Sequence, residues 1–500
     1  MSLHLSTLLD MAAGAFGERV AVGSRAHGMT YEQLLDRSQR AAAVFAERGA
    51  ERIGFLGVNS QTVPIMLYGS AFAGLPFVPV NYRLAGPALQ VILQRTAPSL
   101  FVVDDELIGD AGHVEGLELM STSAFMAALD SVTDQINESS GTPDDIAIML
   151  FTSGTTGQPK AALLRHKHLA AYVLGSVEFM GADEDEAALV GVPPYHVAGM
   201  SAAITSVFAG RRVVYLPNFE PELWLDIAHR EGITQAMVVP TMFGRIVDAV
   251  ERVGSCPTAL RHLSYGGGRM PLPVIQRALA LMPQVAFVNA YGLTETSSTI
   301  AVLTPDDHRQ AFASDDPAIR DRLGSVGRPL PSIELEIRDG LGEPVAPGER
   351  GEIWVRGEQV AGEYLGLRPT MVDGWFPTRD EGALVDGYLY VHGRLDDVIV
   401  RGGENISPGE IEEVLIQHPQ VREAAVFGIP DQEWGEVAAA AVVRRDVDGG
   451  SASVSIDELE SWVRAALRSS RVPAKWFFLD ELPYNETGKL LRRVLKDGLL

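Results

Sequence analysis

The most informative segment of the chain is LFTSGTTGQPK, residues 150–160. An apolar run at residues 146–151 predicts a buried strand, which leads into a loop of hydroxyl side chains and glycines that ends at Lys160. Glycines let backbone N–H groups approach phosphate oxygens, hydroxyls can donate further hydrogen bonds, and the lysine supplies positive charge. The pattern predicts a phosphate-binding loop, with a flexible surface loop as the alternative. The predicted contact residues are Thr152, Ser153, Gly154, Thr155, Thr156 and Gly157.

Extended apolar runs alternate with helical periodicity on both sides of this loop. Pro79 limits one predicted strand to an edge or short strand, because proline has no N–H to donate. Thr30 begins a capping box with Gln33, which predicts a helix start. Strands separated by helix-length segments imply parallel βαβ units and an α/β fold. The predicted strands are residues 52–58, 77–80, 100–103, 212–216 and 235–239.

The C-terminal part of the chain has a smaller pattern of its own. Ser407, followed by Pro408, and Ser455 each begin a capping box, and strands are predicted at residues 424–429 and 437–443. The two patterns meet near residues 394–397. We therefore expect two domains: a large N-terminal α/β domain of several subdomains, residues 1–394, and a small, mobile α+β domain, residues 395–500.

The bulk composition excludes several classes of protein. Of the 500 residues, 46% are hydrophobic, and 65 acidic against 41 basic side chains give a net charge of −24. Such a charge disfavours nucleic acid and anionic lipid as partners. The one cysteine, Cys256, excludes a disulfide framework within one chain. No apolar run reaches the roughly 18 residues that a membrane span needs, and the first residues lack a basic signal region, so we expect a cytoplasmic protein.

The phosphate loop resembles the signature of the acyl-adenylate-forming superfamily, which contains acyl-CoA synthetases, peptide-synthetase adenylation domains and firefly-type luciferases. Its spacing differs from that of a Walker loop, and the resemblance continues, motif after motif, through nearly the whole chain. It implies an AMP-forming acyl-CoA ligase of the fatty acyl or aryl type, which uses ATP, Mg²⁺ and coenzyme A. One departure is Ala161, where the family usually has glycine.

Two further motifs resemble the family's nucleotide site. In residues 289–296, NAYGLTET, the resemblance implies that Tyr291 and Gly292 contact adenine, Thr294 binds the α-phosphate and Glu295 holds Mg²⁺. A glycine run after an apolar segment is implied to approach the adenine. That run is Gly266, Gly267 and Gly268.

The ribose site is implied by residues 375–380, WFPTRD, and by the segment that begins at Gly393. Asp380 would accept two ribose hydroxyls, and Arg394 would reach the ribose or a phosphate. Arg379 replaces the family's usual glycine, so we expect the local backbone to differ.

The C-terminal motifs imply a domain that rotates between two half-reactions. Asp396 resembles the hinge residue, and Gly402 and Gly403 resemble the segment that lines the pantetheine tunnel. Lys489 resembles the lysine that bridges the substrate carboxylate and the α-phosphate, and Tyr484 stands where a basic residue is common.

The acyl pocket is implied by the motif around His196, which would border the substrate carboxylate. Most of the implied pocket residues are small, which favours a bulky apolar acid, either fatty or aromatic. Arg269 is the nearest basic residue in the sequence, and Trp434 either lies near the CoA adenine or belongs to the core of the small domain. The implied pocket residues are Val197, Ala198, Gly266, Ala290, Gly292, Ser297 and Ser298.

The chemistry follows from charge. A carboxylate must attack ATP, so cationic groups are required at the phosphates; Lys160, Lys489 and Mg²⁺ on Glu295 would supply them. The expected partners are a small-molecule carboxylic acid and CoA, with a homodimer left open. Four alternatives stay open: an enzyme that loads a carrier protein, an enzyme that performs mainly one half-reaction, a luciferase-like oxygenase, and a binding protein without catalysis.

Overall fold

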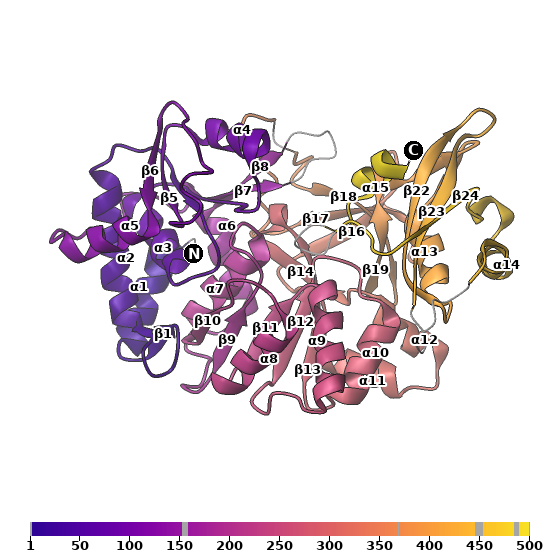
Figure 1. The fold of residues 1–500 in the computed structure, drawn as a ribbon, viewed down its shortest axis with the longest axis horizontal. Coiled ribbons are helices and arrows are strands. Elements are labelled where there is room, and N and C mark those ends of the chain that lie inside the picture. The colour runs from indigo at the N-terminus through magenta and orange to yellow at the C-terminus, as the bar shows by residue number, and fades with distance from the viewer. Residues whose placement is uncertain (1–2, 153–158, 369, 446–453, 485–489, 500) are drawn as a thin grey trace.

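The computed structural model describes residues 3–152, 159–368, 370–445, 454–484 and 490–499. Figure 1 shows a large N-terminal part of sheets and covering helices, and a smaller C-terminal part at one end of the molecule. The predicted fold class, a large α/β part followed by a small α+β part, is confirmed.

The first sheet carries the phosphate loop. Its strand order is β6-β5-β3-β4-β7-β8, and its neighbours are parallel except for the antiparallel pair β7 and β8. The strands are β3 (Ile53–Leu56), β4 (Phe77–Val80), β5 (Ser99–Val103), β6 (Leu117–Ser121), β7 (Ile146–Thr152) and β8 (Lys160–Arg165).

The prediction for β4, an edge or short strand, is confirmed in its second form. The strand has four residues and lies inside the sheet between β3 and β7. The described pairing of β4 with β7 joins Phe77 to Ile148. Because this pairing comes before Pro79, the missing N–H of the proline costs no bond to β7.

The second sheet has nine strands in the order β15-β14-β13-β12-β11-β9-β10-β1-β2. Its middle, from β1 to β13, is parallel, as the alternation of strands and helices predicts. The strands are β1 (Val20–Val22), β2 (Met29–Thr30), β9 (Ala187–Val190), β10 (Arg212–Tyr215), β11 (Gln235–Val238), β12 (His262–Gly266), β13 (Ala286–Leu293), β14 (Ser298–Leu303) and β15 (Arg328–Pro329).

Two smaller sheets follow along the chain, and their strands pair antiparallel except for β23 and β24, which are parallel. The four-stranded sheet β16-β17-β18-β19 leads through η3 into a five-stranded sheet built around β22 and β23. The strands are β16 (Glu334–Arg338), β17 (Gly351–Arg356), β18 (Phe376–Val385), β19 (Tyr388–Arg394), β20 (Ile399–Arg401), β21 (Glu404–Ile406), β22 (Val421–Asp431), β23 (Gly435–Arg444) and β24 (Lys475–Leu479). The predicted domain boundary after residue 394 falls in this linker and stays a prediction.

Helices cover these sheets, and no described helix is both long and apolar enough to cross a membrane. The α-helices are α1 (Leu5–Phe16), α2 (Tyr31–Ala46), α3 (Thr62–Ala73), α4 (Gly86–Thr96), α5 (Thr122–Ser131), α6 (His166–Ser176), α7 (Val197–Ala209), α8 (Pro221–Arg230), α9 (Pro240–Val253), α10 (Leu272–Leu281), α11 (Pro305–Ala313), α12 (Pro317–Arg320), α13 (Pro408–Ile416), α14 (Ile456–Ala466) and α15 (Arg492–Leu499). The short 3₁₀ turns are η1 (Thr294–Thr296), η2 (Asp321–Gly324), η3 (Leu395–Asp397) and η4 (Ser469–Arg471).

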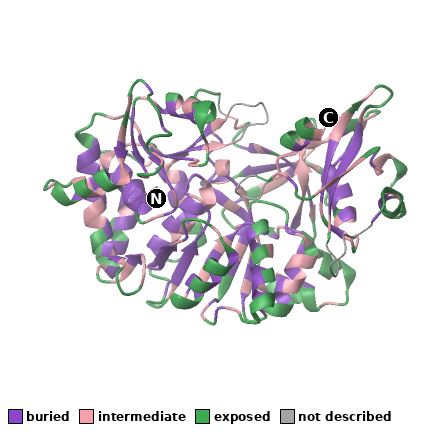
Figure 2. Ribbon diagram, viewed as in Figure 1, coloured by how far each residue is buried: buried purple, intermediate pink, exposed green. Residues whose placement is uncertain are grey.

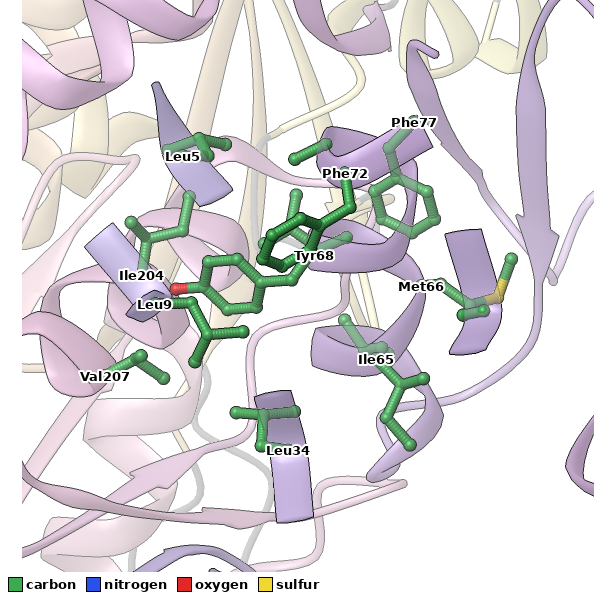
Figure 3. Close-up of a cluster of buried hydrophobic side chains, with 14 of the residues drawn as sticks. Leu5, Leu9, Leu34, Ile65, Met66, Tyr68, Phe72, Phe77, Ile204 and Val207 are labelled. Carbon is green, nitrogen blue, oxygen red and sulfur yellow. The ribbon is translucent and has the colours of Figure 1, made fainter. Parts of the chain in front are cut away.

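The main core joins the first two sheets. Helices α1, α2, α3 and α7 contribute apolar side chains to one cluster, together with residues of both sheets. Figure 3 shows Tyr68 of α3 within this cluster, with Phe72 beside it and Leu9 and Ile204 near its hydroxyl. A second core lies under α8, α9 and α10, and the C-terminal part has separate cores on the two faces of its sheet. Figure 2 shows the buried residues concentrated in the sheets, while α14 and α15 are mostly exposed. Because the C-terminal part has its own cores, it can move without disrupting the main one.

Capping boxes were predicted at the starts of α2, α13 and α14, and two of the three are present. Thr30 and Ser455 form the predicted capping boxes. The helix start predicted at Pro408 is confirmed, but the capping box predicted at Ser407 was wrong. The Ser407 hydroxyl donates to the carbonyl of His392, 3.1 Å away, and makes no cap hydrogen bond. The side chain is used instead to join α13 to β19.

Candidate active site

The phosphate loop lies between β7 and β8, and Lys160 is the first residue of β8. Thr152 ends β7 and is paired with Lys160, and its hydroxyl donates to the Lys160 carbonyl at 3.4 Å. Ala161 is fully buried in the sheet, so this position accommodates a side chain. The predicted loop residues Ser153, Gly154, Thr155, Thr156 and Gly157 lie outside the described residues.

The segment at residues 361–365 contacts both the turn that carries Glu295 and the strand that begins at Lys160. It pairs with β8, since Leu365 N donates to Ala161 O at 2.9 Å. It also holds η1, because Ala361 N donates to Glu295 O at 2.8 Å. The backbone thus ties the metal-site candidate to the strand that starts at the candidate phosphate lysine.

Tyr364 is the side chain at the centre of this arrangement. Its hydroxyl donates a hydrogen bond to the Glu295 carboxylate, and the Lys160 ammonium lies 5.7 Å from the centre of its ring. Burial, followed by the charge of Glu295, raises the pKa of Tyr364, so the phenol stays protonated and remains a donor. The sequence interpretation missed Tyr364, because no local motif marks a contact between residues 69 positions apart.

The residues described here contain no cluster of three or more His, Cys, Asp or Glu side chains that could hold a metal alone. A single carboxylate still fits Mg²⁺, because this ion commonly binds one or two carboxylates together with substrate phosphates and water. Glu295, which is joined through Tyr364 to the neighbourhood of Lys160, fits this mode of Mg²⁺ binding.

The candidate ribose site is a buried carboxylate with two protein donors. The Tyr291 hydroxyl donates to Asp380 Oδ2 at 2.6 Å, and Arg394 Nε lies 2.9 Å from Asp380 Oδ1. Asp380 and Arg394 face each other across β18 and β19. The carboxylate is buried, and at least these two protein groups fix its position between the two strands.

The glycines of the nucleotide motifs have different surroundings. A Cβ on Gly292 would lie 1.8 Å from the Ser298 carbonyl, and one on Gly266 would lie 2.1 Å from the Ala290 carbonyl. Close packing of neighbouring strands therefore requires both glycines. Gly267 has φ +79° and is exposed together with Gly268, so these two are the glycines that a ligand could approach.

His196 is the residue before the first turn of α7, and its side chain makes no cap hydrogen bond. Its Nε2 atom is buried and has no hydrogen-bond partner among the described residues. Burial, assisted by the charge of Arg83, lowers the pKa of His196 to about 3. The imidazole is therefore neutral at physiological pH, and it can act toward a substrate as a hydrogen-bonding group but not as a cation.

The serines of the predicted pocket are more enclosed than we expected. The hydroxyl of Ser297, a fully buried residue, donates to Gln359 O at 2.9 Å, and Ser298 lies 3.1 Å from Ser201 of α7, oxygen to oxygen. Ser297 and Ser298 have φ +59° and +132°, values that are uncommon without glycine. Val197, Ala198 and Ala290 are each half-buried. Their roles in the pocket stay predictions.

The C-terminal candidates lie on the small sheet and in the segment after it. Gly402 and Gly403 form the turn between β20 and β21, with φ +55° and +84°. Trp434 packs against Gly402, and its side chain is 44% exposed, so it is not a core residue of the small domain. The backbone of Tyr484 forms an isolated antiparallel β-bridge with Leu490. Lys489 lies outside the described residues.

Arg269 belongs to the interface with the C-terminal part. It lies 2.7 Å from Glu413 of α13 and donates to Gly409 O at 3.1 Å. This engagement leaves it unsuited to select a second carboxylate in the acid.

The chain matches the family described as AMP-binding enzyme over residues 9–365, and the AMP-binding enzyme C-terminal domain over residues 410–489. It therefore belongs to the AMP-binding enzyme family, and the predicted superfamily and the predicted class of AMP-forming ligase are confirmed.

Relatives with different acids and acceptors are similar to this chain over most of its length. ScoC of Streptomyces coeruleorubidus, a fatty acid–[acyl-carrier-protein] ligase, is 33% identical over 488 residues, 94% of this chain and 91% of its own. A feruloyl-CoA synthase of Amycolatopsis sp. is 32% identical over 481 residues, 93% and 92% of the two chains.

A solved structure extends the comparison. The o-succinylbenzoate CoA synthetase of Bacillus subtilis, in complex with its acyl-adenylate intermediate, superposes with a TM-score of 0.84 at 29% identity and 98% coverage of both chains. The same enzyme, in a complex with ATP and a magnesium ion, also gives a TM-score of 0.84 at 29% identity, with 98% of this chain and 99% of that chain covered.

Proposed function

We propose that this enzyme activates a carboxylic acid with ATP and transfers the acyl group to coenzyme A. A carboxylate oxygen attacks the α-phosphorus of ATP, the bond to the β-phosphate oxygen breaks, and pyrophosphate leaves. The CoA thiol then loses its proton and its sulfur attacks the acyl carbon, and AMP leaves. The observation that carries this proposal is the convergence of Lys160, Tyr364 and Glu295 from three separate segments.

The nucleotide would lie along the ends of β7, β12 and β13. Lys160 and Thr294 would contact phosphates together with the loop at residues 152–157, and Mg²⁺ held by Glu295 would neutralise phosphate charge. Gly267 and Gly268 would approach adenine near Tyr291 and Gly292, and Asp380 with Arg394 would hold the ribose. Lys489 would bridge the carboxylate and the α-phosphate, and Gly402 with Gly403 would line the path of pantetheine.

We propose a bulky apolar acid, fatty or aromatic, as the substrate. The feruloyl-CoA synthase acts on an aromatic acid and ScoC acts on a fatty acid, which supports a pocket of this kind. The neutral His196 at the N-terminal end of α7 would contact the carboxylate, and Val197, Ala198, Ala290, Ser297 and Ser298 would surround the acyl group.

A carrier protein is the competing acceptor, because ScoC is a carrier-protein ligase. We favour CoA because the feruloyl and o-succinylbenzoate relatives are CoA ligases. The test supplies ATP, Mg²⁺ and a panel of aryl and fatty acids, with either CoA or a phosphopantetheinylated carrier protein. We expect acyl-CoA and stoichiometric AMP. Acyl transfer to the carrier alone would reverse the assignment, and acyl-adenylate without either thioester would indicate an enzyme of one half-reaction.

The hydrogen bond from Tyr364 gives a first mutational prediction. Tyr364→Phe removes the donor to Glu295 and should slow pyrophosphate release by about 10- to 100-fold, since hydrogen bonds to charged groups contribute about 1.5–3 kcal/mol. The Mg²⁺ concentration for half-maximal rate should rise as well. Tyr390→Phe on β19, a half-buried tyrosine near Arg322, is the control and should leave both values unchanged.

We also propose a cytoplasmic enzyme, and a homodimer as its assembly. Light scattering coupled to size-exclusion chromatography tests the assembly directly. A mass near twice the chain's 53.9 kDa supports the dimer, and a mass of one chain overturns it.

A further inference from the structure

The two parts of the molecule are joined by a short linker with two adjacent carboxylates. β19 ends at Arg394, η3 spans Leu395–Asp397, and β20 of the small sheet begins at Ile399. Asp396 and Asp397 thus lie where the chain passes from the four-stranded sheet to the five-stranded sheet.

The two carboxylates form ion pairs with arginines from different parts of the molecule. Asp396 Oδ1 lies 2.7 Å from Arg379 Nη2 on β18, in the large part. Asp397 Oδ2 lies 3.2 Å from Arg492 Nη1 on α15, in the small part. Arg492 is itself fixed, because it also contacts Glu412 at 2.7 Å and the Val426 carbonyl at 3.2 Å. A rotation of the small part about the backbone between Asp396 and Asp397 would therefore pull on the ion pair between Arg379 and Asp396.

Arg379 has an unusual backbone that places it for this contact. Its φ is +63°, in the left-handed region that a side chain with a Cβ seldom adopts. Its N–H donates to Glu352 Oε1 at 3.0 Å, which anchors the residue to β17. We expected the local backbone to differ, because Arg379 replaces the family's usual glycine. The replacement does not require such a difference, because Arg379 itself adopts a φ that glycine favours.

The rest of the interface is polar and incompletely filled. A cavity of about 520 Å³ lies between the two parts, and Arg350 and Glu381 line it on one side and Glu410 and Arg471 on the other. Such an interface favours one orientation weakly, so single contacts at its edge can shift the balance between orientations.

The similarity to the o-succinylbenzoate CoA synthetase indicates which orientation this is. The TM-score is 0.84 with that enzyme in complex with its acyl-adenylate intermediate, and 0.69 with its double mutant bound to a product analogue. In the present orientation a Cβ on Gly402 would meet Trp434 of the same small part. This orientation fits acyl-adenylate formation.

We propose that Arg379 is a positioning residue that holds the linker, through Asp396, in the orientation for acyl-adenylate formation, and that the pair opens when the small part rotates toward thioester formation. The inference rests on the proposed two-step function. The two side chains are 55% and 31% exposed, so the pair is weak enough to open on every cycle.

Two measurements test this proposal, and one of them is independent of catalysis. The first is the rate at which trypsin cuts the linker after Arg394 or Arg401, and the second is the ratio of acyl-adenylate formation to thioester formation from a synthetic acyl-adenylate. Arg379→Ala and Arg379→Gly should both raise the cutting rate and lower the ratio, each by about 2- to 5-fold, as expected for an exposed ion pair. Arg379→Lys should restore both values toward the wild type.

The controls separate the ion pair from its surroundings. Asp396→Asn should reproduce Arg379→Ala, and the double variant should add nothing further. Arg356→Ala breaks a comparably exposed pair with Glu334 on the same sheet and should change neither value. About 0.5 M NaCl should remove the difference between wild type and Arg379→Ala, because salt screens exposed charges.

The outcomes are distinguishable. The proposal would be overturned if both Arg379→Ala and Arg379→Gly kept the wild-type cutting rate and the wild-type ratio. It would also be overturned if only one of the two variants differed from the wild type, since that would indicate a backbone effect. If no acid supports adenylation but the cutting rates still change as expected, the proposed function fails while the linker contact stands.

Discussion

Glu295→Gln should slow acid-dependent pyrophosphate release by at least about 100-fold, the range found when one preorganised electrostatic contact is removed from an active site. Glutamine keeps the size of the side chain and can still accept the hydrogen bond from Tyr364. It loses the negative charge that a hard cation such as Mg²⁺ prefers. The Mg²⁺ concentration for half-maximal rate should therefore rise together with the loss of rate.

A nearby exposed glutamate serves as the control for this variant. Glu358→Gln removes the same charge close to β17 and should leave the Mg²⁺ dependence unchanged. The melting temperatures of both variants should match that of the wild type. A Glu295→Gln enzyme with the wild-type Mg²⁺ dependence would remove Glu295 from the metal site.

Lys489→Ala should separate the two half-reactions. We expect acyl-adenylate formation to fall by about 100- to 1,000-fold, because a cation opposite two approaching anions acts mainly in the transition state. Conversion of a synthetic acyl-adenylate to the thioester should stay within about 3-fold of the wild type, since the lysine is expected to leave the site before that step. Single-turnover measurements of each half-reaction check both values.

Lys475→Ala on β24 is the matched control, because it removes an exposed lysine of the same small part. It should affect neither half-reaction. An equal loss of both half-reactions in Lys489→Ala would contradict the assigned role and would indicate a general effect on the domain.

The sequence predicted those features that depend on short stretches of chain. Strand and helix positions followed from periodicity, because each element carries its own apolar pattern. The residues of the nucleotide motifs could be named in advance because these short segments resemble the motifs of the acyl-adenylate-forming superfamily. The structure then placed both Tyr291 and Arg394 within hydrogen-bond distance of the Asp380 carboxylate.

Features that depend on distant contacts could not be read in this way. Tyr364 was missed, because its partner Glu295 is brought to it by pairing between separate sheets. Ser407 looked like a helix cap, but β19 offers its hydroxyl a carbonyl from another sheet. The ion pair of Arg379 with Asp396 was equally invisible, since the sequence marks only the replaced glycine.

Acid-dependent exchange of labelled pyrophosphate into ATP reports whether this enzyme forms an acyl-adenylate. The exchange needs no CoA, because it reports the reversal of the first half-reaction alone. We predict exchange that requires both Mg²⁺ and a bulky apolar acid and that Glu295→Gln slows by at least about 100-fold. If no acid of the panel supports exchange under conditions where the folded enzyme binds ATP, the enzyme does not form the acyl-adenylate that we propose.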